Sequence, residues 1–186
     1  AAGRNMVING AMNVAQRGTS LTGLSAAGAG NLLLDRFKVQ SSGSAGRFTM
    51  TQTADGPNGI SANCLKLDCT TADTSIAAGE FFYLRQQFEG QNLQRIGQGV
   101  VGAKQTTISF YVKANAALTF AVELFHGDGH NRQISKLFAT TTDWVRHEIL
   151  IPADVDDGSS PIDDDNAESM AINFWLHAGA TYTGGT

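Results

Sequence analysis

The feature that most constrains the fold is an alternation of apolar and other residues between positions 107 and 114. Ile108, Phe110 and Val112 alternate there with Ser109, Tyr111 and Lys113. Because successive side chains of a strand point to opposite faces of its sheet, this period of two predicts a half-buried strand. The three apolar residues are expected on the buried face.

Short segments of similar character recur along the chain, separated by turns rich in Gly, Asn and Asp. The segments expected to be extended are 5–14 (a short strand that runs into a turn at Asn9-Gly10), 32–39, 47–52, 64–69, 108–113, 118–125, 134–139, 144–152 and 170–176. Residues 16–31 are expected to form an exposed loop, and residues 80–89 a strand or a short helix. About nine or ten short strands predict an all-β fold, a jelly-roll β-sandwich of two antiparallel sheets.

Composition narrows the class of protein further. The 186 residues contain 42% hydrophobic and 16% charged residues, with 21 Gly and only 3 Pro. No Pro-rich linker divides the chain, so a single domain over residues 1–186 is expected. A net charge of −4 argues against nucleic-acid binding, which needs concentrated Lys and Arg. No apolar run approaches the roughly 18–20 residues of a membrane span, so no membrane insertion is expected.

The two cysteines are expected to be free thiols. Cys64 and Cys69 are five positions apart, and an odd separation on one strand sends their side chains to opposite faces. Cys69 is expected on a buried face with Leu65 and Leu67. A metal site at the cysteines is disfavoured because the chain has no further Cys.

Three aromatic residues are expected on sheet faces that point away from the core, namely Tyr111, Phe125 and Trp175. Two interpretations remain open for them. They fill a subunit interface or lie under a loop, or they form a carbohydrate-binding platform, since the CH groups of a sugar pack on aromatic rings. The first interpretation is favoured by the sequence.

Several polar clusters have residue types found in metal-binding or catalytic sites. The segment His126-Gly127-Asp128-Gly129-His130 fits a flexible hairpin tip better than a metal site. An acidic segment fits a solvated loop better than a calcium site, because its spacing matches no known calcium loop; it holds Asp154, Asp156, Asp157, Asp163, Asp164 and Asp165. Arg85, Glu89 and Arg95 suggest a charge-paired structural or interface role. No cofactor is expected, with calcium as the alternative, and no enzymatic activity is expected because no catalytic motif is present.

The order of several motifs resembles known families. Asn9-Gly10, Cys64-Leu65-Lys66-Leu67, Ser109 to Ala114 and Thr141-Thr142-Asp143-Trp144 resemble jelly-roll carbohydrate-binding modules found beside glycoside hydrolases. A narrower resemblance is to tail-fibre and related virion proteins of tailed phages. It rests on Asn5 to Gly10, on Val14 to Ser20, on Asp35-Arg36-Phe37 and on Gln86 to Leu93.

The resemblance implies a non-enzymatic structural protein of the virion, a tail-fibre or receptor-binding domain that attaches to host-surface glycans. Homotrimers and contacts with other virion proteins are implied by the same family. A capsid decoration protein and a carbohydrate-binding module of a polysaccharide-degrading enzyme are the alternatives. Phe37 stands where the tail-fibre pattern has Trp, and the end at Thr183 to Thr186 suggests a longer parent chain or a missing closing strand.

Overall fold

The computed structural model describes residues 5–25, 31–128, 131–155 and 161–184, and over these ranges the chain is all-β, as the sequence predicts. The only helices in the described ranges are two short 3₁₀ turns, η1 (Gly90–Asn92) and η2 (Ala180–Tyr182). The strands are β1 (Ser20–Leu24), β2 (Asn31–Leu32), β3 (Phe37–Ser42), β4 (Arg47–Thr53), β5 (Cys64–Thr71), β6 (Phe81–Glu89), β7 (Thr106–Val112), β8 (Thr119–His126), β9 (Arg132–Ala139), β10 (Val145–Ile151) and β11 (Glu168–Ala178). Every strand pairing with a recorded register is antiparallel.

The residues group into two compact units. Apart from the ends of the chain, unit 1 contains residues 87–173, and unit 2 contains residues 7–86 and 174–185. Strands β6 and β11 each run from one unit into the other. The expectations of a single domain and of jelly-roll topology stay predictions.

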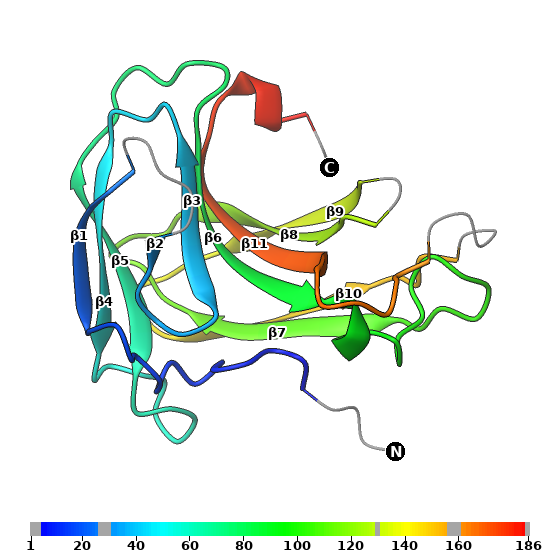
Figure 1. The fold of residues 1–186 in the computed structure, drawn as a ribbon. Coiled ribbons are helices and arrows are strands. Elements are labelled where there is room, and N and C mark those ends of the chain that lie inside the picture. The colour runs from blue at the N-terminus through cyan, green and yellow to red at the C-terminus, as the bar shows by residue number, and fades with distance from the viewer. Residues whose placement is uncertain (1–4, 26–30, 129–130, 156–160, 185–186) are drawn as a thin grey trace. The chain divides into compact units, whose positions relative to one another are not determined.

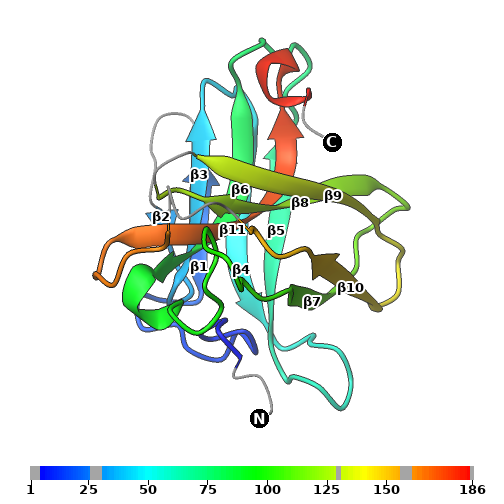
Figure 2. The same ribbon diagram turned by 90° about the vertical axis from the view of Figure 1, so that its right-hand side faces the viewer.

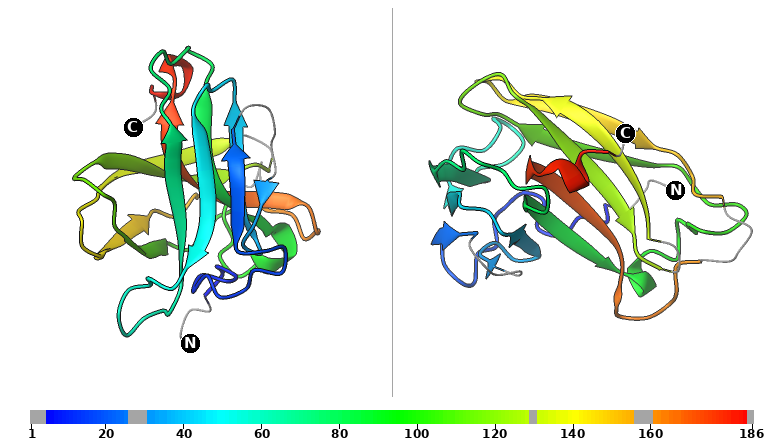
Figure 3. Two further views of the ribbon diagram at one scale, coloured as in Figure 1. Left: turned by 90° about the vertical axis from the view of Figure 1, so that its left-hand side faces the viewer. Right: turned by 90° about the horizontal axis from the view of Figure 1, so that it is seen from above.

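Unit 2 is built from two sheets with a core between them. In the first sheet β4 pairs with β1 and with β5, and Figure 3 shows these three strands side by side. In the second sheet, β3 pairs with β2 and with β6, and the end of β11 is the next strand beside β6 (Figure 1). Phe48 of the first sheet stacks on Phe82 of the second, with ring centroids 4.0 Å apart. Around this contact lie the buried residues Leu24, Leu33, Leu34, Phe37, Val39, Met50 and Leu84.

Unit 1 has the same antiparallel character. Strand β7 pairs with β10 along its whole length, and β8 pairs with β9 (Figure 2). Phe110 of β7 lies edge-on to Phe138 of β9 at 5.0 Å, so an apolar contact joins the two pairs of strands. Ile108 is buried between the exposed Thr107 and Ser109, as the alternation predicts, whereas residues 110–113 are all half-buried.

The N-terminal region differs from the sequence-based expectation. Residues 5–14 form no strand; they contain the predicted turn, in which Asn9 has a φ of 58° and the Met12 amide donates to the Asn9 carbonyl. Residues 20–24, expected in a loop, form β1, and Leu24 is buried in the core. The sequence pattern did not predict this strand, because it contains only two apolar side chains, Leu21 and Leu24, among Gly, Ser and Thr. Residues 26–30 of the expected loop lie outside the described part of the chain.

Burial departs from strict alternation in three places. Leu118 precedes β8 and is 44% exposed, while Glu123 within β8 is buried. In β11 every residue from Ser169 to Asn173 is buried, because both faces of the strand are covered there. Cys69 is exposed instead of buried, since it lies near the end of β5; both cysteines are free thiols, as expected.

Candidate functional site

One face of the second sheet in unit 2 carries the main candidate site. Side chains at the even positions of β6 point into the core, as Phe82 and Leu84 do. Side chains at the odd positions of β6 therefore point to the opposite face of the sheet. Side chains at the even positions of β3 lie on that same face, because Gln40 of β3 is paired with Tyr83 of β6. We call this surface the aromatic face; its residues are Lys38, Gln40, Phe81, Tyr83, Arg85, Trp175 and the neighbouring Tyr182.

Four aromatic rings meet on this face. The Trp175 ring centroid lies 4.7 Å from that of Tyr83, 6.2 Å from Phe81 and 5.7 Å from Tyr182. Phe81 also stacks on Tyr83 at 5.3 Å and meets Tyr182 edge-on at the same distance. Tyr83 is buried, Phe81 and Trp175 are half-buried, and Tyr182 is 43% exposed. The cluster therefore runs from the sheet out to solvent.

Polar groups border the rings. The Gln40 Oε1 atom accepts hydrogen bonds from the Tyr83 hydroxyl at 3.0 Å and from the Arg85 guanidinium at 2.9 Å. Lys38 lies opposite Arg85 across the strands, and burial together with the Arg85 charge lowers the pKa of Lys38. Flat rings beside an amide and two cationic side chains can stack on a sugar and also hydrogen-bond its hydroxyls.

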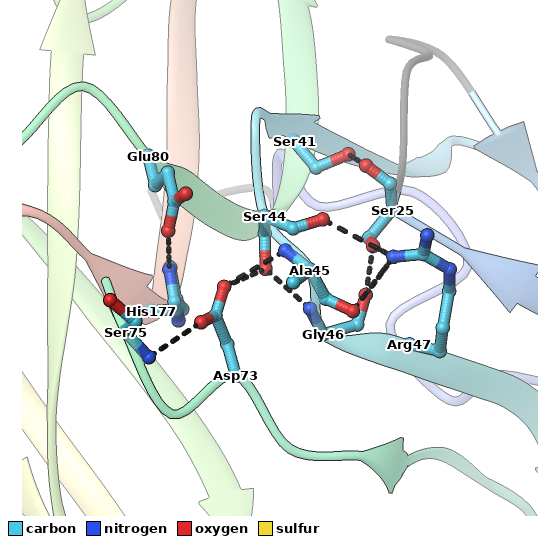
Figure 4. Close-up of polar contacts among 10 residues, drawn as sticks. All are labelled: Ser25, Ser41, Ser44, Ala45, Gly46, Arg47, Asp73, Ser75, Glu80 and His177. Carbon is cyan, nitrogen blue, oxygen red and sulfur yellow. Dashed lines mark hydrogen bonds and ion pairs between the residues drawn. The ribbon is translucent and has the colours of Figure 1, made fainter. Parts of the chain in front are cut away.

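A second cluster in unit 2 joins a carboxylate pair to an imidazole (Figure 4). His177 lies near the end of β11, and Glu80 is the residue before β6. The His177 Nε2 atom is 3.6 Å from the Glu80 Oε2 atom. One ligand atom each of Asp73, Glu80 and His177 lies within 4.8 Å of the others. We call these three residues the Asp-Glu-His cluster; it is the group in the described part of the chain that could hold a metal ion.

The loop around Asp73 is held by its carboxylate. The Ser75 amide donates to Asp73 Oδ1 at 3.0 Å, and the Ala45 amide and Ser44 hydroxyl donate to Oδ2 at 2.9 and 3.2 Å. These bonds, led by the Ser75 amide, lower the pKa of Asp73. Figure 4 shows how they tie the segment after β5 to the turn between β3 and β4.

Arg47 fixes that turn from the other side. Its guanidinium donates to the carbonyl oxygens of Ser44, Ala45 and Gly46 at 3.2, 2.9 and 2.7 Å. The Ser25 hydroxyl donates to the same Gly46 carbonyl. A charged donor on three successive carbonyls makes the turn a rigid support for Asp73.

The structure places the three sequence-predicted sugar-binding residues in different units. Trp175 lies on the aromatic face of unit 2, while its neighbours Phe174 and Leu176 pack on the core, as parity predicts. Tyr111 and Phe125 belong to unit 1, where both are half-buried; they face Arg146 and Gln133 on the paired strands. Only Trp175 of the three thus belongs to the aromatic face.

The histidine segment does not behave as a flexible tip at its start. His126 ends β8, is buried, and its Nδ1 lies 3.2 Å from Asp154 Oδ2. Arg132 donates to the other Asp154 oxygen at 2.6 Å. The expectation was wrong for His126 because Asp154, distant in sequence, pairs with it. Gly129 and His130 lie outside the described residues.

The remaining acidic and charged candidates stay near the surface. Asp163, Asp164 and Asp165 are exposed, while Asp156 and Asp157 lie outside the described residues. The Glu89 carboxylate accepts a hydrogen bond from Gln91 at 2.8 Å, and Arg95 is exposed.

Three residues that carry the tail-fibre resemblance make long-range structural contacts. The Asn9 side chain donates to the carbonyls of Val14 and Asp35, and Asp35 Oδ2 accepts from the Gln16 amide. The buried Gln86 amide bonds to both backbone groups of Ile8. These motif residues hold the N-terminal segment in place, which gives them a reason to occur together apart from any ligand.

Sequence reasoning missed the Asp-Glu-His cluster and the role of Gln40. Asp73, Glu80 and His177 share no motif, and His177 lies nearly one hundred positions after Glu80. Gln40 follows directly after the expected strand 32–39, and nothing in the sequence pairs it with Tyr83. Only the register of β3 against β6 brings them together.

No protein-family model, curated protein or solved structure matches this chain. Among the described residues, no helix has the length and apolar character that crossing a membrane requires.

Proposed function

We propose that this chain is a non-enzymatic attachment domain of a tailed-phage virion, in a tail fibre or receptor-binding protein, and that the aromatic face of unit 2 binds host-surface glycans. The observation that carries the glycan proposal is the contact of Trp175 with Tyr83 and Phe81 beside Gln40 and Arg85. The virion assignment rests on the motif resemblance, chiefly residues 5–20.

The chemistry of the face suits a neutral or acidic sugar. A pyranose ring packs its CH groups on an aromatic side chain, and its hydroxyls bond to amides and guanidinium groups. Arg85 and Lys38 would favour a carboxylate or sulfate on the glycan. A single face of this kind binds weakly, so attachment would rely on several copies held in a homotrimer and presented together.

The direct test is binding of the chain to a glycan array, followed by titration of each bound glycan. Trp175→Ala and Tyr182→Ala are expected to weaken binding at least about tenfold, equivalent to about 1.4 kcal/mol. Tyr111→Ala is the matched control, because Tyr111 belongs to unit 1.

Two outcomes would contradict this assignment. Loss of binding in Tyr111→Ala but not in Trp175→Ala would move the site to unit 1. A stable trimer that binds no glycan would favour an assembly role, such as capsid decoration. The alternative function, a carbohydrate-binding module of an enzyme, would use the same aromatic face. A glycoside hydrolase domain elsewhere in the parent chain would favour that alternative.

A further inference from the structure

Two of the buried polar atoms of unit 2 have no hydrogen-bond partner among the residues that the structure describes. They are Glu80 Oε2 and His177 Nε2, on side chains that are only 13% and 10% exposed. They face each other at 3.6 Å, beyond ordinary hydrogen-bond length. Buried polar atoms are nearly always satisfied, because an unmet one costs the full loss of its hydration. Something besides the described side chains is therefore expected between them.

A third donor is already in position. Asp73 lies close enough for the three side chains to share one ion, since one ligand atom of each lies within 4.8 Å of those of the other two. Its carboxylate is held by Ser75, Ala45 and Ser44, so it is oriented before any ion arrives. A prepositioned ligand lowers the entropy lost on binding.

We propose that Asp73, Glu80 and His177 bind one divalent transition-metal ion of the zinc class. An imidazole nitrogen with two carboxylates is a donor set for zinc and its neighbours rather than for calcium, which takes oxygen ligands. Two atoms that are each about 2.1 Å from a tetrahedral zinc lie about 3.4 Å apart. The separation of 3.6 Å between Glu80 and His177 is close to that value.

The ion would act as a cross-link at one end of unit 2. Asp73 follows β5, Glu80 precedes β6 and His177 lies near the end of β11, so one ion joins three segments that are distant in sequence. Three protein ligands leave a fourth position on zinc open to water or to an external group. Because His177 and Trp175 are two positions apart on β11, their side chains share one face of the strand, and the bound ion would also fix the strand that carries the Trp175 ring.

The test uses tag-free protein stripped with a chelator and titrated with Zn²⁺ by calorimetry. One saturable site per chain is expected, together with a rise in Tm that grows with zinc concentration. His177→Gln and Glu80→Gln are each expected to weaken binding at least about tenfold, since even outer-sphere changes at metal sites cost that much. His147→Gln, the same change on β10, is the matched control and should leave binding unchanged.

A spectrum of the Co²⁺-loaded wild-type chain gives a measurement that does not depend on variants folding. A tetrahedral or five-coordinate visible spectrum without a thiolate charge-transfer band is expected. Absence of a stoichiometric site, a thiolate band from Cys64 or Cys69, or binding that survives both His177→Gln and Glu80→Gln would overturn the proposal. A plain ion pair of protonated His177 with Glu80 would then account for their contact. Glycan binding by Trp175 is measured separately, so either proposal can fail alone.

Discussion

The side-chain amide of Gln86 makes two hydrogen bonds to the backbone of Ile8, 78 positions earlier. The Ile8 amide donates to Gln86 Oε1 at 2.9 Å, and Gln86 Nε2 donates to the Ile8 carbonyl at 2.9 Å. Gln86 is only 3% exposed, while Ile8 is 48% exposed, so the two bonds are partly buried. A buried amide thus replaces a strand partner for a segment that belongs to no sheet.

Replacement of Gln86 by Ala should therefore destabilise unit 2. The change removes both bonds and leaves a cavity, with an expected loss of about 1–3 kcal/mol in the free energy of unfolding. Urea denaturation at neutral pH measures it. Gln105→Ala, at an exposed position, should stay within about 0.5 kcal/mol of the parent chain. Equal effects of the two changes would contradict the role of Gln86.

Loss of the Phe82 ring should cost more, because it lies in the middle of the unit 2 core. Phe82 is fully buried and stacks on Phe48. Phe82→Ala should lower the free energy of unfolding by about 3–5 kcal/mol, as large-to-small changes in cores do. Leu150→Ala, at a side chain that is 59% exposed, is the control in the same thermal or urea experiment. A small effect of Phe82→Ala would mean that the two sheets of unit 2 do not pack as described.

Unit 1 contains a buried polar pair whose separation should be costly. Asn173 Nδ2 donates to Glu123 Oε1 at 2.8 Å, and the two residues are 3% and 6% exposed. Asn173→Ala removes a donor from a buried carboxylate, with an expected loss of about 1.5–3 kcal/mol. Asn115→Ala, at an exposed position, should have little effect in the same unfolding measurement. If Asn173→Ala is as stable as the parent, the pair does not contribute to unit 1.

A pH dependence is expected from Asp163. Partial loss of hydration and then the negative charge of Asp128 raise the pKa of Asp163 above its usual value of 3.8. The folded chain therefore holds that proton more tightly than the unfolded chain, and stability falls as pH rises from 3.8 through the folded pKa. Above this window the ionised carboxylate destabilises the fold.

Asp163→Asn should accordingly raise Tm at neutral pH and change it little below pH of about 3.8. Thermal unfolding across the pH range measures the difference. Asp143→Asn, at another exposed Asp, is the control for the loss of one negative charge. A Tm that falls at neutral pH in Asp163→Asn would show that the carboxylate is stabilising, against the prediction.

The sequence alone predicted the all-β class and most strands, because alternation and turn chemistry are local properties. The segments 47–52 and 64–69 became β4 and β5, and the ambiguous residues 80–89 became β6. β1 was missed because its small polar residues resemble a loop, although Leu24 enters the core. Parity also failed within β11, where both faces are covered and a period of two carries no information about burial.

The residues of the aromatic face and of the Asp-Glu-His cluster could not be brought together from the sequence, because they come from strands distant in the chain. Parity correctly put Trp175 opposite Phe174 and Leu176, but its ring partners Phe81 and Tyr83 come from a strand far away in the chain. What the sequence determined by itself was the faces on which side chains lie, since adjacent residues alternate by covalent geometry. Strand pairing and loop closure alone decided which faces meet, and they brought His177, Glu80 and Asp73 together. The sequence does not show this, because contacts between distant residues leave no periodic signal in the chain.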